Sequence, residues 1–101
     1  MNVLMQWNIR GLQANREELN LLLSQYNPLV ICLQETFQHA SKNITIKNYS
    51  LYSIPAIEVN GSLHGGVATL VKNGIPHTHI QLNTSLQATA CLLYTSDAAD
   101  E

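Results

Sequence analysis

The sequence predicts an α/β fold, because a buried strand, a helix and a second buried strand follow one another within residues 3–35. Two short apolar runs, at 3–9 and 29–33, have the length and composition of strands. The continuous run at 29–33 is typical of a parallel strand that is covered on both faces. We therefore expect the two strands to lie parallel, joined by a right-handed helical crossover.

The expected helix begins after Asn15 and ends before Asn27-Pro28. Asn15 suits an N-cap, and Glu18 three residues later approximates a capping box. Pro28 cannot donate a backbone hydrogen bond and disfavours helix in the residue before it. One apolar face follows the helical spacing, formed by Leu19, Leu22, Leu23 and Tyr26.

The second half of the chain predicts further strands. Residues 36–48 are polar and poorly periodic, which indicates a loop, and residues 58–62 resemble a turn or exposed loop. The turn signal Asn73-Gly74 predicts a hairpin between the strands on either side of it. The expected strands are 49–54, 66–71, 77–82 and one that begins at 86–90.

Composition indicates one small globular domain, since 46% of the 101 residues are hydrophobic and 12% are charged. The net charge is -2 and the five Lys and Arg residues are scattered, so charge gives no support for DNA binding. The two cysteines form no disulfide framework, and we expect Cys32 to act as a small hydrophobic residue in a reducing compartment. Neither a secretory signal nor a membrane span is apparent, which favours an intracellular protein with no membrane partner.

Asn8 and Glu35 are the residues to which we first assign chemistry. They stand at the ends of two strands about 4.8 Å apart, at the sheet edge where open α/β sheets place ligands. Their oxygens suit Mg²⁺, which binds one or two carboxylates and keeps waters. On geometry alone, the alternative has more weight: Asn8 serves a turn and Glu35 is a solvated residue after a strand.

Four blocks of sequence resemble the endonuclease/exonuclease/phosphatase superfamily, and most of all its jockey-like branch of non-LTR retrotransposon endonucleases. The blocks are residues 6–12 (QWNIRGL), 15–19 (NREEL), 30–36 (VICLQET) and 65–71 (GGVATLV). The resemblance spans residues 3–90. It implies the N-terminal portion of a four-layer α/β sandwich, two packed mixed sheets flanked by helices, which is incomplete in this sequence.

The resemblance also implies a function. The parent protein would be a Mg²⁺-dependent endonuclease, with Mn²⁺ as an alternative, that nicks target DNA for retrotransposition. It would also have RNA-directed DNA polymerase activity, bind the element RNA through the polymerase part, and reach the nucleus at least transiently. Asn8 matches the family residue that orients the phosphate and metal-bound water, and Glu35 matches a direct metal ligand. We thus expect both at the catalytic and metal site.

Other readings stay open. The chain could be a remnant of a decayed element with no function. It could also belong to another member of the superfamily, such as an abasic-site nuclease or a phosphoinositide phosphatase. A small nucleotide-binding α/β module is disfavoured, because the first turn at 8–11 lacks the glycine fingerprint.

Several motifs that the resemblance implies do not follow Glu35 in this sequence: a catalytic Tyr, an Asp-x-Asn motif and a late Ser-Asp-His. Since these groups would position the nucleophile and act as general base, we expect the 101-residue chain by itself to be inactive. A sheet without its later strands also leaves unpaired edges and half a core, so we expect poor folding.

Conspicuous residues elsewhere favour structural roles. Gly65-Gly66 indicates a tight turn rather than a phosphate cradle. We expect Trp7 to lie in the core. Arg10 is an even choice between a surface charge and a phosphate contact. His77 and His79 share a strand face, and without further ligands at metal spacing we expect surface residues rather than a zinc site.

Residues 91–101 resemble the translation of a transposase adapter used in sequencing libraries. One reading frame of that adapter spells Cys91 through Asp100 in order, and its last incomplete codon is compatible with Glu101. We therefore predict two parts: a partial endonuclease/exonuclease/phosphatase domain at 1–90 and an adapter-derived artefact tail at 91–101.

Overall fold

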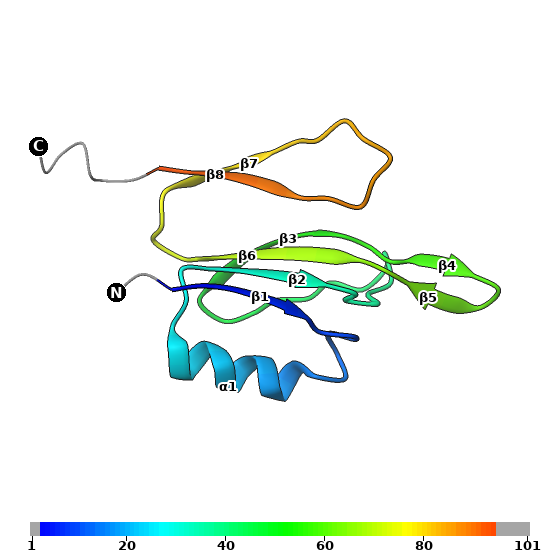
Figure 1. The fold of residues 1–101 in the computed structure, drawn as a ribbon, viewed down its shortest axis with the longest axis horizontal. Helices are drawn as coiled ribbons and strands as arrows, with labels where there is room; N and C mark the ends of the chain where they lie inside the picture. Colours follow the sequence, from blue (N-terminus) through cyan, green and yellow to red (C-terminus); the bar gives the residue numbers. More distant parts are fainter. Residues whose placement is uncertain (1–2, 95–101) are drawn as a thin grey trace, which may run out of the picture.

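The computed structural model describes residues 3–94, which form one helix and eight strands (Figure 1). The elements in chain order are β1 (Leu4–Asn8), α1 (Arg16–Tyr26), β2 (Val30–Gln34), β3 (Tyr49–Ile54), β4 (Ile57–Val59), β5 (Ser62–His64), β6 (Val67–Lys72), β7 (His77–Ile80) and β8 (Ala90–Leu93). No helix within residues 3–94 is long and apolar enough to cross a membrane.

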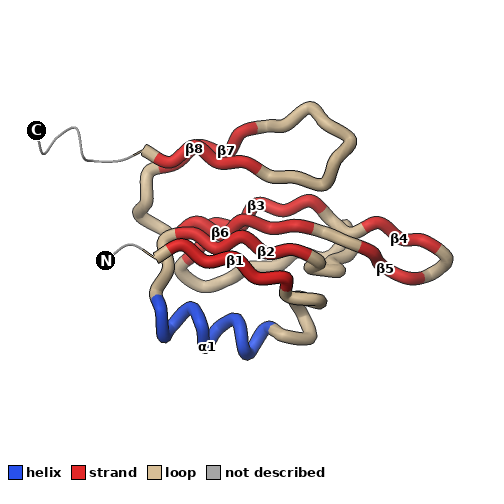
Figure 2. Tube along the Cα trace, in the orientation of Figure 1, coloured by secondary structure: helices blue, strands red, loops and turns tan. Residues whose placement is uncertain are grey.

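A four-stranded mixed sheet of order β1-β2-β6-β3 is the centre of the fold. β1 and β2 pair in parallel, from Leu4 opposite Val30 to Asn8 opposite Gln34, and β6 runs antiparallel to both β2 and β3. Figure 2 shows α1 on one side of this sheet and the β7–β8 pair on the other. The predicted strand-helix-strand unit is therefore confirmed.

The core lies between α1 and the sheet. Leu19 and Leu23 of α1 pack with strand residues that alternate toward the helix, and Trp7 packs against the same cluster as predicted. The buried strand residues of this cluster are Ile31, Leu33, Ala68 and Leu70. Tyr26, expected on the apolar helical face, is 49% exposed because the helix ends there, so the expectation was wrong for this residue.

Asn15 occupies the N-cap position but does not cap the helix with its side chain. Its Nδ2 instead donates to the carbonyl of Ile9 at 2.7 Å, which fixes the turn that leaves β1. The predicted capping box is therefore wrong. At the other end Asn27 is left-handed (φ 47°), and its N–H donates to the carbonyl of Leu23, as expected for a helix stopped before proline.

The predicted hairpin between β6 and β7 is also wrong. β6 has no free edge, because β2 and β3 occupy both sides of it, and β7 pairs with β8 in a separate sheet. Asn73-Gly74 does form a turn, but it sends the chain to the other layer. β8 includes three residues of the segment assigned to an adapter; that assignment stays a prediction, and residues 95–101 lie outside the described residues.

Residues 58–62, expected to form a turn or exposed loop, belong to the β4–β5 hairpin. Its turn is Asn60-Gly61, and both residues have positive φ (52° and 82°), as tight hairpin turns of this kind require. The hairpin projects past the end of the main sheet (Figure 1).

Cys32 is exposed, although the apolar run around it predicted burial on both faces. Its neighbours Ile31 and Leu33 point toward the helix and are buried, whereas Cys32 shares the opposite face with Gln6 and Thr69. Cys32 lines a surface hollow together with residues 87–89, the segment before β8. The prediction of a strand covered on both faces was therefore wrong at this position.

Candidate functional site

The carboxyl ends of β1 and β2 bring Asn8 and Glu35 into contact. Asn8 is the last residue of β1, opposite Gln34, so the next residue along β2 reaches it. Asn8 Nδ2 donates a hydrogen bond of 2.7 Å to Glu35 Oε2. This bond orients the carboxylate, and it leaves Oδ1 as the side-chain atom through which Asn8 could bind a cation.

The backbone around this pair is in an uncommon conformation. Arg10, Glu35 and Phe37 all have positive φ, at 50°, 53° and 53°. Such residues cost on the order of 1–3 kcal/mol each and persist where surrounding structure holds them. Two hydrogen bonds hold them here, from Gly11 N–H to the Glu35 carbonyl and from Leu12 N–H to the Thr36 carbonyl, both 2.8 Å. Glu35 therefore stands in a constrained turn rather than a relaxed loop.

Gly65-Gly66 supports the same turn from the β6 side. The N–H groups of Thr36 and Phe37 donate to the carbonyls of Gly66 and Gly65, at 3.1 Å and 2.9 Å. A Cβ on Gly66, whose φ is 91°, would lie 2.3 Å from Thr36 Oγ1. The expected tight turn is not formed, because residues 65 and 66 join β5 to β6 without a turn. Both glycines have positive φ, and the close approach to Thr36 leaves no room for a Cβ at Gly66.

Gln87 holds the diglycine segment, and the sequence analysis did not identify it. Its Oε1 accepts the N–H of Gly66 at 2.9 Å, and its Nε2 donates to the Pro55 carbonyl at 3.1 Å. Gln87 precedes β8 in a segment without regular structure, so no periodicity could have marked it.

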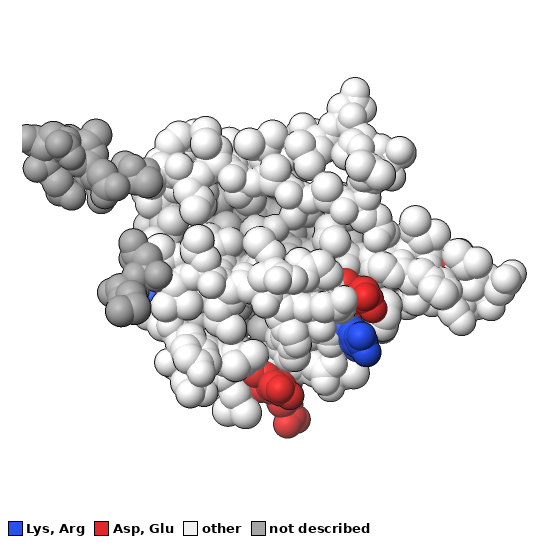
Figure 3. Space-filling model, viewed as in Figure 1, with Lys and Arg blue, Asp and Glu red and all other residues white. Residues whose placement is uncertain are grey.

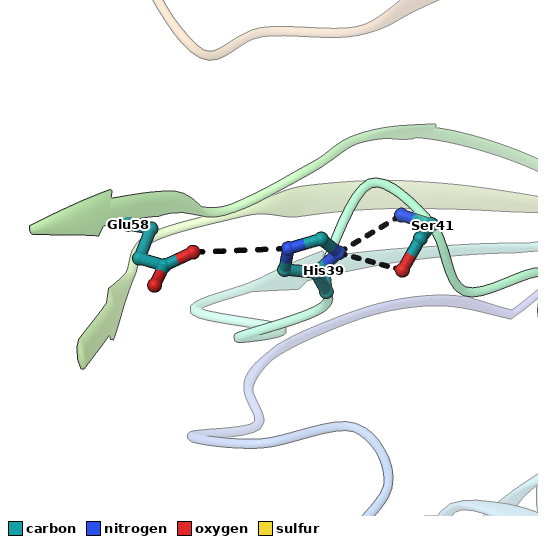
Figure 4. A network of polar contacts seen from close by, with 3 residues as sticks. All are labelled: His39, Ser41 and Glu58. Carbon is teal, nitrogen blue, oxygen red and sulfur yellow. Dashed lines mark hydrogen bonds and ion pairs between the residues drawn. The ribbon is translucent and has the colours of Figure 1, made fainter. Parts of the chain in front are cut away.

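The loop after Glu35 is tied to the β4–β5 hairpin. Ala56 N–H donates to the Gln38 carbonyl at 2.9 Å. His39 Nδ1 lies 2.8 Å from Ser41 Oγ, and its Nε2 lies 3.8 Å from Glu58 Oε1 (Figure 4). Ser, His and an acidic residue form the catalytic triad of some hydrolases. Here His39 and Glu58 are about half exposed and their contact is long, which does not fit a catalytic triad. This set therefore tethers two loops beside the site.

His77 and His79 of β7 lie against Tyr52 of β3, a strand of the neighbouring sheet. The Tyr52 ring stacks on His79 at 4.6 Å and meets His77 edge-on at 5.5 Å. Because the Ile75 carbonyl needs the proton of His77 Nδ1, His77 Nε2 accepts from the Tyr52 hydroxyl at 2.7 Å. His77 is thus half-buried, contrary to the expected surface position, whereas His79 is exposed.

The metal donors are few in this part of the chain. Within residues 3–94 no group of three or more His, Cys, Asp and Glu side chains could hold a metal ion. Glu35 with Asn8 Oδ1 offers only oxygen donors, which suits Mg²⁺ with its retained waters and does not suit zinc. Arg10 is exposed two residues after Asn8, so a positive charge stands near the pair in sequence.

Comparison with known proteins matches the chain to one family. The profile of the Endonuclease/Exonuclease/phosphatase family matches residues 5–95. The RNA-directed DNA polymerase from mobile element jockey of Drosophila melanogaster is 32% identical over 72 residues, which are 71% of this chain but 8% of that protein.

Solved structures agree on the fold. The APE2 catalytic domain from Xenopus laevis superposes with a TM-score of 0.58 and 28% identity, covering 76% of this chain and 26% of that one. The AP endonuclease LMAP from Leishmania major superposes with a TM-score of 0.58 and 24% identity, covering 78% of this chain and 28% of that one. The chain thus spans about a quarter of the length of these structures and has part of their α/β sandwich, as the sequence predicted. It belongs to the endonuclease/exonuclease/phosphatase family.

Proposed function

We propose that this chain is the N-terminal part of a Mg²⁺-dependent endonuclease that nicks target DNA for retrotransposition, in a parent protein with RNA-directed DNA polymerase activity. The observation that carries the proposal is the 2.7 Å contact between Asn8 and Glu35 at the carboxyl ends of two parallel strands. The jockey relative, named as an RNA-directed DNA polymerase of a mobile element, supports the retrotransposon assignment.

Each residue of the pair has a distinct task in this proposal. The Glu35 carboxylate would hold the cation, which when bound would neutralise charge on the phosphodiester and its leaving oxygen. Asn8 holds that carboxylate in one orientation through its Nδ2 and helps to orient the scissile phosphate. The constrained backbone keeps the carboxylate at the sheet edge, so little reorganisation accompanies binding.

The partners follow from the same proposal. The parent protein would bind DNA at this edge of the sheet and the element RNA through its polymerase part. It would therefore work in the nucleus at least transiently.

The 101-residue chain by itself is not expected to nick DNA, because the nucleophile-positioning and general-base motifs of the family do not follow Glu35. Purified chain is incubated with supercoiled plasmid and Mg²⁺, and conversion to open circles is measured. Appreciable nicking that disappears in Glu35→Ala would contradict this expectation.

An abasic-site nuclease is the second candidate, favoured by the 28% identity to the APE2 catalytic domain. A long read of the uncloned locus across the junction of Ala90 and Cys91 would supply the continuing frame. The enzyme from that frame is then given an intact plasmid and a duplex with one abasic site. Preference for the intact plasmid and a downstream polymerase frame support the retrotransposon proposal; strong preference for the abasic duplex supports the second.

A further inference from the structure

We propose that a basic cavity alongside α1 binds a phosphate group. The cavity has a volume of about 440 Å³. Three basic side chains, Arg16, Lys47 and Lys72, and three amide side chains, Asn20, Asn27 and Asn48, line it. We call this set the basic cavity.

Separate segments of the chain bring these residues together. Arg16, Asn20 and Asn27 lie along α1 and its C-cap, Lys47 and Asn48 precede β3, and Lys72 ends β6. Backbone hydrogen bonds join the segments: Lys72 N–H donates to the Leu29 carbonyl at 2.8 Å, and Asn73 N–H donates to the Asn48 carbonyl at 2.9 Å. The cavity walls are therefore held by the fold itself.

The charge of the basic cavity is out of proportion to the rest of the chain. The sequence has five Lys and Arg residues and a net charge of -2, yet three of those five line this one cavity. No Asp or Glu is among the described residues that line it, and Glu17 and Glu18 line a different surface hollow of α1. Cations that share a cavity repel one another, so an anion between them would stabilise the arrangement.

This concentration of charge corrects the expectation that the basic residues are scattered. The face of the molecule shown in Figure 3 is mostly uncharged. The sequence could not show this concentration of charge, because the three cations are separated by 31 and 25 positions (47 minus 16, and 72 minus 47).

The donors suit phosphate in particular. Arg16 Nη2 donates to the Thr45 carbonyl, which anchors the guanidinium while its other N–H groups stay available for a ligand. Guanidinium, ammonium and amide N–H groups are the side-chain donors that proteins use most for phosphate oxygens. A phosphate offers several strong acceptor oxygens and more charge than a single carboxylate, so it matches three cations and three amides better.

Neither Asn8 nor Glu35 lines the basic cavity, and its Lys72 lies at the far end of the sheet from them, whereas Arg16 begins α1 on their side. Lys72 pairs with Tyr49 at one end of β6, whereas Val67 pairs with Gln34 beside Glu35 at the other. Five steps along a strand place the two ends about 16 Å apart. The inference therefore does not rest on the proposed nuclease function.

The test is titration of the ¹⁵N-labelled 101-residue chain with inorganic phosphate and, separately, with a short single-stranded oligodeoxynucleotide. Amide resonances around the basic cavity should shift and saturate. Lys47→Gln and Lys72→Gln should each weaken binding about fivefold, whereas Lys42→Gln, which removes an equal charge outside the cavity, should change it little. Lys47→Arg keeps the charge and should retain binding, which separates lost charge from lost folding.

The two ligands distinguish the sources of the phosphate. Tighter, salt-sensitive binding of the oligonucleotide indicates a nucleic-acid backbone, and binding of inorganic phosphate alone indicates a small phosphate ligand. Absence of saturation with both ligands overturns the proposal. So does equal weakening by Lys42→Gln and the two cavity variants, because binding would then follow overall charge.

Discussion

Replacing Gly66 with alanine tests whether the close contact between the diglycine segment and Thr36 stabilises the site around Glu35. A non-glycine residue at positive φ costs roughly 1–2 kcal/mol. The new Cβ would also lie 2.3 Å from Thr36 Oγ1 and 3.2 Å from the backbone nitrogen of Ala56, and Thr36 is only 2% exposed. Forcing an extra methyl group into such a contact typically costs about 1–3 kcal/mol. We therefore expect Gly66→Ala to lower the free energy of unfolding by about 3 kcal/mol.

Gly74→Ala is the matched control. Gly74 also has a positive φ, of 95°, but nothing lies within 4 Å of an added Cβ. We therefore expect Gly74→Ala to lower the free energy of unfolding only by the cost of a positive φ, about 1 kcal/mol. Both variants are measured by urea denaturation followed by circular dichroism. Equal destabilisation of the two variants would show that the contact between Gly66 and Thr36 contributes nothing to stability.

Two further predictions concern the surroundings of the site and of the basic cavity. Gln87→Ala removes the hydrogen bonds to Gly66 and Pro55, so we expect the free energy of unfolding to fall by about 1–2 kcal/mol. Gln81→Ala, at an exposed position, should change it little in the same denaturation assay. Burial raises the pKa of Tyr49 above its ordinary value of 10.0, so the folded chain binds this proton more tightly than the unfolded chain. The stability that the protonated Tyr49 hydroxyl contributes is present at pH values below 10.0 and is lost as the pH rises through the folded-state pKa. Tyr49→Phe should therefore lose less stability than the wild type on alkaline titration, with exposed Tyr26→Phe as control; identical pH profiles for all three would contradict this.

The predictable parts of the fold are those that short stretches of sequence specify by themselves. The apolar runs and the helical spacing between them specify β1, α1 and β2, and a right-handed crossover places Asn8 near Glu35 without further information. The contact of these two side chains could thus be expected from sequence, although its catalytic meaning is a proposal.

The errors arose where distant segments decide the outcome. Asn73-Gly74 has the same local signal as Asn60-Gly61, yet only the second makes a hairpin, because β6 has both edges occupied. The second edge of β6 is occupied by β3, and the sequence around β6 does not indicate that pairing. Gln87 acts on Gly66 across 21 positions, so it too is visible only once the chain is folded.

Our proposal that Glu35 binds the metal of a DNA-nicking enzyme is tested with variants of the enzyme from the continuous reading frame. Plasmid nicking in Mg²⁺ is measured for the wild type, Glu35→Gln and the control Glu17→Gln, an exposed carboxylate in the first turn of α1. We expect Glu35→Gln to lower the rate at least about 100-fold and Glu17→Gln to leave it unchanged. A Glu35→Gln enzyme that nicks DNA at the wild-type rate would contradict the account.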